Sequence, residues 1–269
     1  METQFDLESW SELEAKVRDI KENENAPGFR QNGLFSQLIF RGQSNAEWPL
    51  ETTLDRTKSK DKSLSTYYRI AGIAKKQIET FTSRTWSDLD YAKLVIALQD
   101  YNSLVPFTTL PNYDYLVYLR HHGFPSPLLD WSRSLYIAAF FAFNNPLADR
   151  VAIFMYQEHA GEGKYDSSNE PRIIGLGPNV RSHPRHFLQQ GEYTLCIQYI
   201  DGRWSIGKHS DVFNLNYKGQ DKLWKLTLPA NEAKTVMQKL EEYNITSFSL
   251  FQTEESLLES LARKHIPTT

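Results

Sequence analysis

Cysteine is almost absent from this sequence, and that absence excludes two kinds of site. Cys196 is the single cysteine among 269 residues, so an internal disulfide and a zinc site built from cysteines are both ruled out. Cys196 lies in the strand-like segment TLCIQYI, where we expect a small buried hydrophobic residue rather than a nucleophile. No carboxylates or histidines have the spacing of metal ligands. The sequence therefore predicts no metal site, and a nuclease or metal hydrolase is poorly supported.

The chain also lacks a strong excess of charge and an apolar run long enough to cross a membrane. Its 30 Lys and Arg residues nearly balance its 33 Asp and Glu residues, for a formal net charge of -3. This balance gives no general basic field, so a nucleic-acid partner is not indicated. The apolar run at 135–143 is far shorter than the about 20 residues that span a bilayer. With no signal peptide or lipidation motif, we expect a cytoplasmic protein without a membrane partner.

What the sequence does have is ordinary globular composition, with 40% apolar and 23% charged residues. That composition predicts one compact domain over residues 1–269. Helical patterns dominate the first half of the chain and strand patterns the second, which is typical of an α+β fold. We expect a helix-rich N-terminal half around a buried central helix, packed on a mostly antiparallel sheet.

Apolar periodicity gives the expected elements. It predicts helices at 7–21, 62–82, 86–101, 229–243 and 254–263, and another from about 111 to the His-His-Gly sequence at 121–123. Short apolar runs predict strands at 38–40, 151–156, 193–200, 203–206, 223–228 and 245–251, with a hairpin turn at Asp201-Gly202. The polar segment 157–171 has little to bury, so we expect a mobile loop there.

The segment YLVYLRHHGFPSPLLDWSRSLYIAAFFAF, at residues 115–143, is the stretch around which the chain is organised. Its last part, 135–143, has no polar face at helical spacing and predicts a helix buried on all sides. Asp130, Ser132 and Ser134 precede this helix, and their side-chain oxygens are candidate N-caps.

Two adjacent histidines, His121 and His122, precede Gly123 in the same segment. A glycine after cationic residues is typical of a helix end, which is the simplest interpretation of the pair. Neighbouring residues on a helix point roughly 100° apart, so the two rings cannot both face one metal ion.

The triplet Phe40-Arg41-Gly42 ends the first expected strand. A guanidinium at a strand end can hold phosphate or carboxylate with two parallel hydrogen bonds. The alternative is a structural ion pair between Arg41 and Asp130, since a buried arginine requires a partner in either case. Gly42 would let the backbone turn and let a ligand come close. We expect Arg41 and Asp130 to line one hollow.

Several other residues have both a functional and a structural interpretation. Trp48 and Trp131 could stack on a flat ring, but a large aromatic residue is more often part of the core. Gln190 and Glu192 begin an expected strand, where alternation puts both on one face. Glu192 could act in catalysis, but most single surface carboxylates are simply solvated.

The motifs FRGQSNAEWPLETTLDR at 40–56 and HHGFPSPLLDWSRSLYIAAFFAF at 121–143 together resemble the FRG domain, a bacterial family named after its Phe-Arg-Gly triplet. The family positions matched are Phe40, Arg41, Gly42, Gln43, Trp48, Leu50, His122, Gly123, Pro125, Leu128, Leu129, Asp130, Trp131, Ser132 and Ala142. Gln190-Gly191 resembles a later element. The resemblance covers about 35–262, with the helix at 7–21 as an extension. It implies a setting in bacterial defence or toxin systems.

The chain departs from the FRG pattern at three places. Arg120 stands where the family often has Gln, and Leu135 stands where Pro is common. The C-terminal sequence SLFQTEESL is only loosely similar to the family's last element, which weakens any role near Glu254.

A second resemblance is to ADP-ribosyltransferases of the Arg-Ser-Glu type. FRG at 40–42, DWSRS followed by IAAFFAF, and QQGEY at 189–193 occur in the order of that family's three elements, although Asp130 and Trp131 are not part of its pattern. The resemblance implies a fold of that type with NAD as substrate and a macromolecular acceptor that the sequence does not identify. Arg41 would grip the pyrophosphate or ribose, Ser132 the nicotinamide ribose, and Glu192 would stabilise the developing positive charge.

The remaining expected ligand-binding residues surround these three. They are Gly42, Gln43, His122, Asp130, Trp131 and Gln190. The alternative hypothesis is a non-catalytic recognition module, in which Arg41 and Asp130 form a buried pair that shapes a pocket for a ligand or partner.

Overall fold

The computed structural model describes residues 2–24, 34–99, 110–161, 164, 169–181 and 184–266. Its strands are β1 (Glu2–Asp6), β2 (Leu34–Phe35), β3 (Ile39–Gln43), β4 (Leu128–Ser132), β5 (Arg150–Gly161), β6 (Arg172–Gly175), β7 (Gly191–Ile200), β8 (Arg203–Ile206) and β9 (Gln220–Pro229). Its helices are α1 (Trp10–Glu24), α2 (Leu64–Thr82), α3 (Tyr91–Gln99), α4 (Tyr113–His121), α5 (Leu135–Phe143), α6 (Pro184–Leu188), α7 (His209–Asn214), the 3-10 turn η1 (Ala230–Glu232), α8 (Ala233–Glu242), α9 (Ser247–Phe251) and α10 (Glu254–His265).

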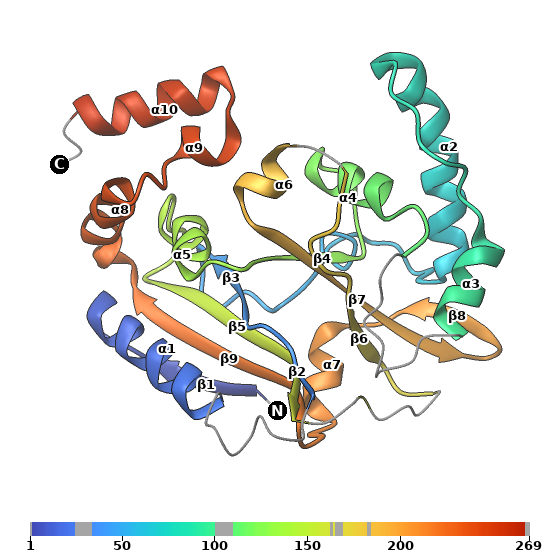
Figure 1. Cartoon of the computed structure of the whole chain (residues 1–269), viewed down its shortest axis with the longest axis horizontal. Coiled ribbons are helices and arrows are strands. Elements are labelled where there is room, and N and C mark those ends of the chain that lie inside the picture. The colour runs from blue at the N-terminus through green and yellow to red at the C-terminus, as the bar shows by residue number, and fades with distance from the viewer. Residues whose placement is uncertain are drawn as a thin grey trace.

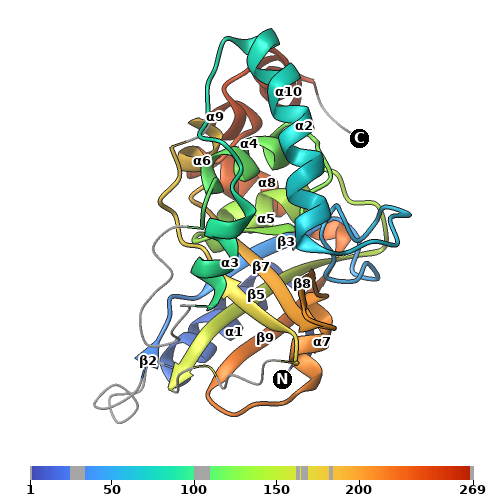
Figure 2. The same ribbon diagram turned by 90° about the vertical axis from the view of Figure 1, so that its right-hand side faces the viewer.

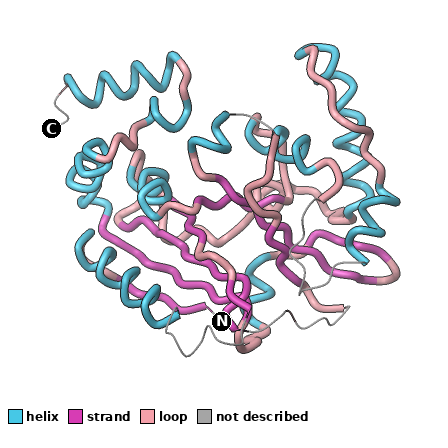
Figure 3. The backbone as a smooth tube through the Cα atoms, viewed as in Figure 1, coloured by secondary structure: helices cyan, strands magenta, loops and turns pink. Residues whose placement is uncertain are grey.

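One sheet runs through the molecule, in the order β1-β9-β5-β3-β4-β7-β6, with β2 beside β5 and β8 beside β7. β1 is parallel to β9, and the other strand pairs are antiparallel. Figure 3 shows these strands as one twisted layer, with most helices on one side of it. The predicted α+β class with a mostly antiparallel sheet is therefore confirmed.

Alternation along the strands divides the core between the two faces of the sheet. On one face, α1, α5 and α8 cover β3, β5 and β9, while α2, α3 and α4 cover β4, β6 and β7. On the other face, α7 packs on a third cluster that includes Trp131 and Tyr156. Figures 1 and 2 both place α2 and the α9–α10 pair on the side of the sheet away from α7.

The central helix α5 has the bounds that its apolar run predicts, Leu135–Phe143. The Ser134 side chain caps it by accepting a hydrogen bond from the backbone N–H of Ile137, as expected of a residue with this side chain. Most of its side chains are buried, but Phe141 is 37% exposed. The helix therefore presents one aromatic ring outside the core.

Gly42 lies inside β3, rather than at the end of the strand as predicted. A Cβ added there would lie 1.9 Å from the carbonyl oxygen of Ala138 in α5. The missing side chain therefore lets α5 approach the strand closely.

Two further predictions are wrong. Asp130 does not cap a helix, because Leu128–Ser132 form strand β4 and Ser134 is the cap of α5. The expected strand at 245–251 is helix α9, which begins with a capping box between Thr246 and Ser249. A short apolar run fits either element, and the capping box determines which one forms.

Part of the predicted mobile loop 157–171 is structured, and its residues 162–163 and 165–168 lie outside the described residues. β5 continues to Gly161, and the ammonium of Lys164 is buried 2.6 Å from Asp221. The structure also contains β1, β2, β6, α6 and α7, which apolar periodicity did not predict. The expected helix at 86–101 begins later, at Tyr91, and its last two positions lie outside the described residues.

The described part of the chain contains neither a membrane-crossing helix nor a cluster of metal ligands. No helix there has the length and apolar character needed to cross a bilayer. Likewise, no three His, Cys, Asp or Glu side chains in those residues gather closely enough to hold a metal ion.

His209 in α7 is a buried titratable group on the opposite face of the sheet from α5. Its Nε2 lies 2.9 Å from the hydroxyl oxygen of Thr194 in β7. Burial lowers the pKa of His209 to about 3, because a charged imidazolium would lose its hydration there. The native state therefore holds this ring in its neutral form at neutral pH.

Gly42→Ala should destabilise the protein by about 3 kcal/mol or more, because α5 must move away from β3 to make room for the methyl group. The matched control is Gly72→Ala in α2, where an added Cβ meets no atom within 4 Å. The control should stabilise the helix by up to about 1 kcal/mol. Urea unfolding followed by circular dichroism measures both. Equal effects of the two substitutions would contradict the proposed close contact between α5 and β3.

Because of His209, the free energy of unfolding should decrease as the pH is lowered. The unfolded chain binds a proton near pH 6.5 and the native state does not, so the contribution is complete above pH 6.5 and is lost as pH drops toward 3. At pH 5 the loss is about 2 kcal/mol. Urea unfolding at pH 7.5 and at pH 5 measures the free energy of unfolding. The loss of stability between the two should be smaller for His209→Gln than for the wild type. The control is His265→Gln, which replaces an exposed histidine. If His209→Gln lost as much stability between the two pH values as the wild type, His209 would not be the group responsible.

Candidate functional site

The sheet opens between β3 and β4, and Arg41 fills the opening. The two strands pair only through Phe40 and Ser132 within the described residues, whereas β4 continues along β7 for five residue pairs. Nη1 of Arg41 donates to the backbone carbonyl oxygen of Asp130 at 2.9 Å and to its carboxylate Oδ1 at 2.6 Å. The side chain therefore supplies hydrogen bonds where the ladder between the strands stops.

A second guanidinium reaches the same carboxylate from α4. Nη2 of Arg120, in the last turn of that helix, donates to Oδ1 of Asp130 at 2.6 Å. Charge-assisted bonds of this length are among the stronger hydrogen bonds in proteins. One carboxylate oxygen thus ties β3, β4 and α4 together.

The pKa of Asp130 reflects two opposing effects. Loss of hydration would raise it, but the guanidiniums of Arg41 and Arg120 outweigh that effect and hold the pKa well below its ordinary range. The side chain still keeps 44% of its surface accessible, because it faces an open pocket. Asp130 is therefore an ionised carboxylate that solvent or a ligand can reach.

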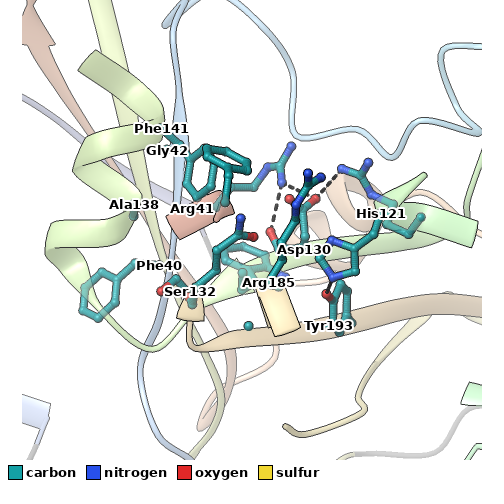
Figure 4. A pocket seen from close by; sticks show the side chains of 15 residues that line it. Phe40, Arg41, Gly42, His121, Asp130, Ser132, Ala138, Phe141, Arg185 and Tyr193 are labelled. Atoms are coloured by element: carbon teal, nitrogen blue, oxygen red, sulfur yellow. Dashed lines mark hydrogen bonds and ion pairs between the residues drawn. The ribbon is translucent and has the colours of Figure 1, made fainter. Parts of the chain in front are cut away.

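The pocket has a cavity volume of about 170 Å³ and lies where β3, β4, β7 and α5 meet α4, α6 and α9. Figure 4 shows the pocket from close by. It is lined by Phe40, Arg41, Gly42, Arg120, His121, Asp130, Trp131, Ser132, Ala138, Phe141, Arg185, Gln189, Gly191, Tyr193 and Phe251. Arg41 and Asp130, which are 89 positions apart, share this hollow as predicted.

A third guanidinium, that of Arg185 in α6, lines the pocket beside an aromatic wall. Its central carbon lies 5.4 Å from the ring centre of Phe251, within the range of a cation–π contact. Phe251 in turn meets Phe141 edge to face, with ring centres 6.1 Å apart. Three guanidiniums and the single carboxylate of the lining leave this pocket with a net charge of two positive.

His121 and Tyr193 form a polar pair on the same wall. Nε2 of His121 lies 2.8 Å from the hydroxyl oxygen of Tyr193. Burial, and to a smaller degree the negative charge of Asp130, raise the pKa of Tyr193 well above its ordinary value. The phenol therefore keeps its proton at neutral pH and serves as a hydrogen-bonding group.

Ser132 lines the pocket, but its hydroxyl is already engaged. It donates to the carbonyl oxygen of Gln189 at 2.8 Å and accepts from the backbone N–H of Ser134 at 3.1 Å. These bonds fix the turn before β7 and the start of α5. Trp131 is buried and stacks on Tyr156, so its ring belongs mainly to the core.

Glu192 is predicted to be catalytic, but it does not line the pocket. Its neighbours Gly191 and Tyr193 do, and alternation along β7 points Glu192 to the other face of the sheet. There it lies 3.8 Å from the guanidinium of Arg133, and burial raises its pKa. Gln190 precedes the strand in the left-handed region, with φ of 48°, so it does not share a strand face with Glu192.

Two other predicted ligand-binding residues lie outside the lining. Gln43 is buried, and its amide nitrogen donates to the carbonyl oxygen of Pro49 at 3.4 Å. His122 follows α4 as its C-cap, with its ring 4.2 Å from that of Tyr118. The helix-ending interpretation of the histidine pair is confirmed, but its first member, His121, reaches the pocket.

Sequence reasoning missed several pocket residues. They are Arg120, His121, Phe141, Arg185, Tyr193 and Phe251. Arg120 was visible as a departure from the family pattern, ten positions before Asp130. Arg185 lies in a helix of five residues, which is too short for a periodic signal.

Asp130 and Arg120 should be energetically coupled. Asp130→Asn leaves two neighbouring guanidiniums without their counter-charge, and Arg120→Gln removes one of them, so the double variant should lose less than the sum of the single losses. Urea unfolding at pH 7 should give a coupling of about 1–3 kcal/mol. The control cycle is Asp90→Asn with Lys93→Gln, a more exposed pair 3.8 Å apart, for which we expect less than about 0.5 kcal/mol. Equal couplings in the two cycles would refute the special role of Asp130.

Comparison with known proteins identifies part of the chain. No curated protein and no solved structure matches it. A family model matches residues 36–150, a segment that contains Arg41, Arg120 and Asp130 but ends before Arg185. Its start agrees with the expected beginning of the resemblance near residue 35, and the expected later elements lie beyond the match. Residues 36–150 of this chain are an FRG domain.

Proposed function

We propose that the pocket around Asp130 binds NAD or a related nucleotide through its phosphate groups. The observation that carries the proposal is the convergence of three guanidiniums on a hollow that holds a single carboxylate. Guanidinium groups are well suited to phosphate because their planar donors match its oxygens in pairs. The excess of two positive charges leaves an anion-binding site after Asp130 has been neutralised.

The arginines are held ready for such a ligand. Asp130 occupies Nη1 of Arg41 and Nη2 of Arg120. The other terminal nitrogens, Nη2 of Arg41 and Nη1 of Arg120, have no hydrogen-bond partner in the part of the chain that the structure describes. Fixing both side chains in advance lowers the entropy lost when a phosphate binds.

The aromatic wall gives the proposed ligand a second point of contact. Phe141 keeps 37% of its surface exposed and meets Phe251 edge to face in this wall. Aromatic rings of this kind pack against a base or a nicotinamide ring. The pocket thus combines a charged side for phosphate with an apolar side for a flat group.

Cleavage of NAD or transfer of its ADP-ribose is the second candidate. It is favoured by the presence of both Arg41 and Ser132 in the pocket, the first two residues that the transferase resemblance names. The reaction needs a carboxylate placed against the developing positive charge. Glu192, the predicted residue, is held on the other face of β7 beside Arg133, so a non-catalytic recognition module agrees better with the geometry. The FRG resemblance implies bacterial defence or toxin systems as the setting for either activity.

Calorimetric titration of the full chain with NAD tests the binding. Arg185→Gln should weaken the affinity for NAD at least tenfold, because it removes one guanidinium from the pocket. Arg203→Gln, in which an exposed arginine of β8 is replaced, should leave the affinity unchanged. No binding of either NAD or adenosine 5'-monophosphate at millimolar concentration would reject the proposal.

The same samples with labelled NAD distinguish binding from chemistry. We expect Glu192→Gln to bind NAD like the wild type and neither protein to release nicotinamide. If the wild type releases nicotinamide and Glu192→Gln does not, the result would instead establish cleavage of NAD.

A further inference from the structure

The cavity at Asp130 is small for a complete dinucleotide. Its volume of about 170 Å³ lies below the roughly 300–1,000 Å³ of pockets that enclose drug-sized ligands. A cavity of this size suits a phosphate group and part of a sugar better than two complete nucleotides. A ligand such as NAD would leave most of its atoms outside.

The charges in the cavity match a particular kind of phosphate. The three guanidiniums and Asp130 leave two positive charges within one compact space. A phosphate monoester carries about -1.5 to -2 at pH 7, because its second pKa is near 6. Each phosphate inside a pyrophosphate bridge or a diester carries only one negative charge. A terminal monoester therefore neutralises the pocket with a single group.

Asp130 adds a second requirement, for a hydroxyl near the phosphate. Both arginines bind its Oδ1, while Oδ2 has no hydrogen-bond partner among the described residues. An ionised carboxylate repels phosphate oxygens but accepts a hydrogen bond from a neutral hydroxyl. A bound ligand would therefore turn its phosphate toward the arginines and a sugar hydroxyl toward Asp130.

We propose, resting on the nucleotide-binding function above, that the pocket selects a terminal phosphate monoester with a nearby sugar hydroxyl, as in a nucleoside monophosphate. The arginines that line the cavity come from three different elements, β3, α4 and α6, so they can surround the three oxygens of such a group. The phenyl rings of Phe141 and Phe251 lie on the remaining side and contact the apolar part of the ligand.

Calorimetry of the full chain with four ligands tests this inference. Adenosine 5'-monophosphate should bind at least tenfold more tightly than its phosphate methyl ester, which has nearly the same size but one negative charge fewer. It should also bind more tightly than NAD. The 2',3'-dideoxy analogue should bind several-fold more weakly, because it has no hydroxyl for Asp130. Arg185→Gln should reduce the preference for the monophosphate over its methyl ester, and Arg203→Gln should retain it.

The other outcomes separate this inference from the function on which it rests. Equal affinity for the monophosphate and its methyl ester would overturn the selection of a monoester. Binding of NAD without binding of the monophosphate would overturn this inference and leave the proposed function standing. Absence of binding by all four ligands would overturn both.

Discussion

The ion pairs of Asp130 are the interaction on which the site depends. One carboxylate oxygen receives guanidiniums from β3 and α4, while Asp130 itself lies in β4. Because β3 and β4 stop pairing beside it, the sheet would otherwise have an opening with unpaired peptide groups. Arg41 bonds across that opening, and the space left beside the ion pairs is the pocket. The same contacts that hold the strands therefore also create a charged cavity.

The pocket draws on more of the chain than the FRG match. Residues 36–150 supply Arg41, Arg120 and Asp130, and these three form the fixed part of the site. Arg185 and the rings of Tyr193 and Phe251 come from later elements. The third guanidinium changes the balance, because two arginines and one aspartate alone leave a single positive charge. The segment after the match thus contributes to how strongly the pocket attracts an anion.

Local patterns predicted the elements that depend on local interactions. The apolar run of α5 gives the correct helix, and Asp201-Gly202 gives the correct hairpin. Spacing could not place Arg41 beside Asp130, since the contact joins distant residues through the sheet; the pairing was predicted from the need of a buried arginine for a partner. The strand β4 was missed because Asp130 and Ser132 are also good capping residues. The geometry at Glu192 was missed because the register of β7 decides its face, and a shift of one residue would reverse it.

The electrostatics of Asp130 also limit what chemistry the pocket can perform. A general base works best when its pKa is near the pH at which it operates, but two guanidiniums hold the pKa of Asp130 far below that. Its carboxylate therefore accepts hydrogen bonds without taking a proton at neutral pH. Glu192 has a raised pKa, which suits proton transfer better, yet it faces away from the pocket. Asp130 lies in the pocket but has a low pKa, and Glu192 has a raised pKa but faces away, so neither carboxylate combines access to the pocket with a pKa suited to proton transfer.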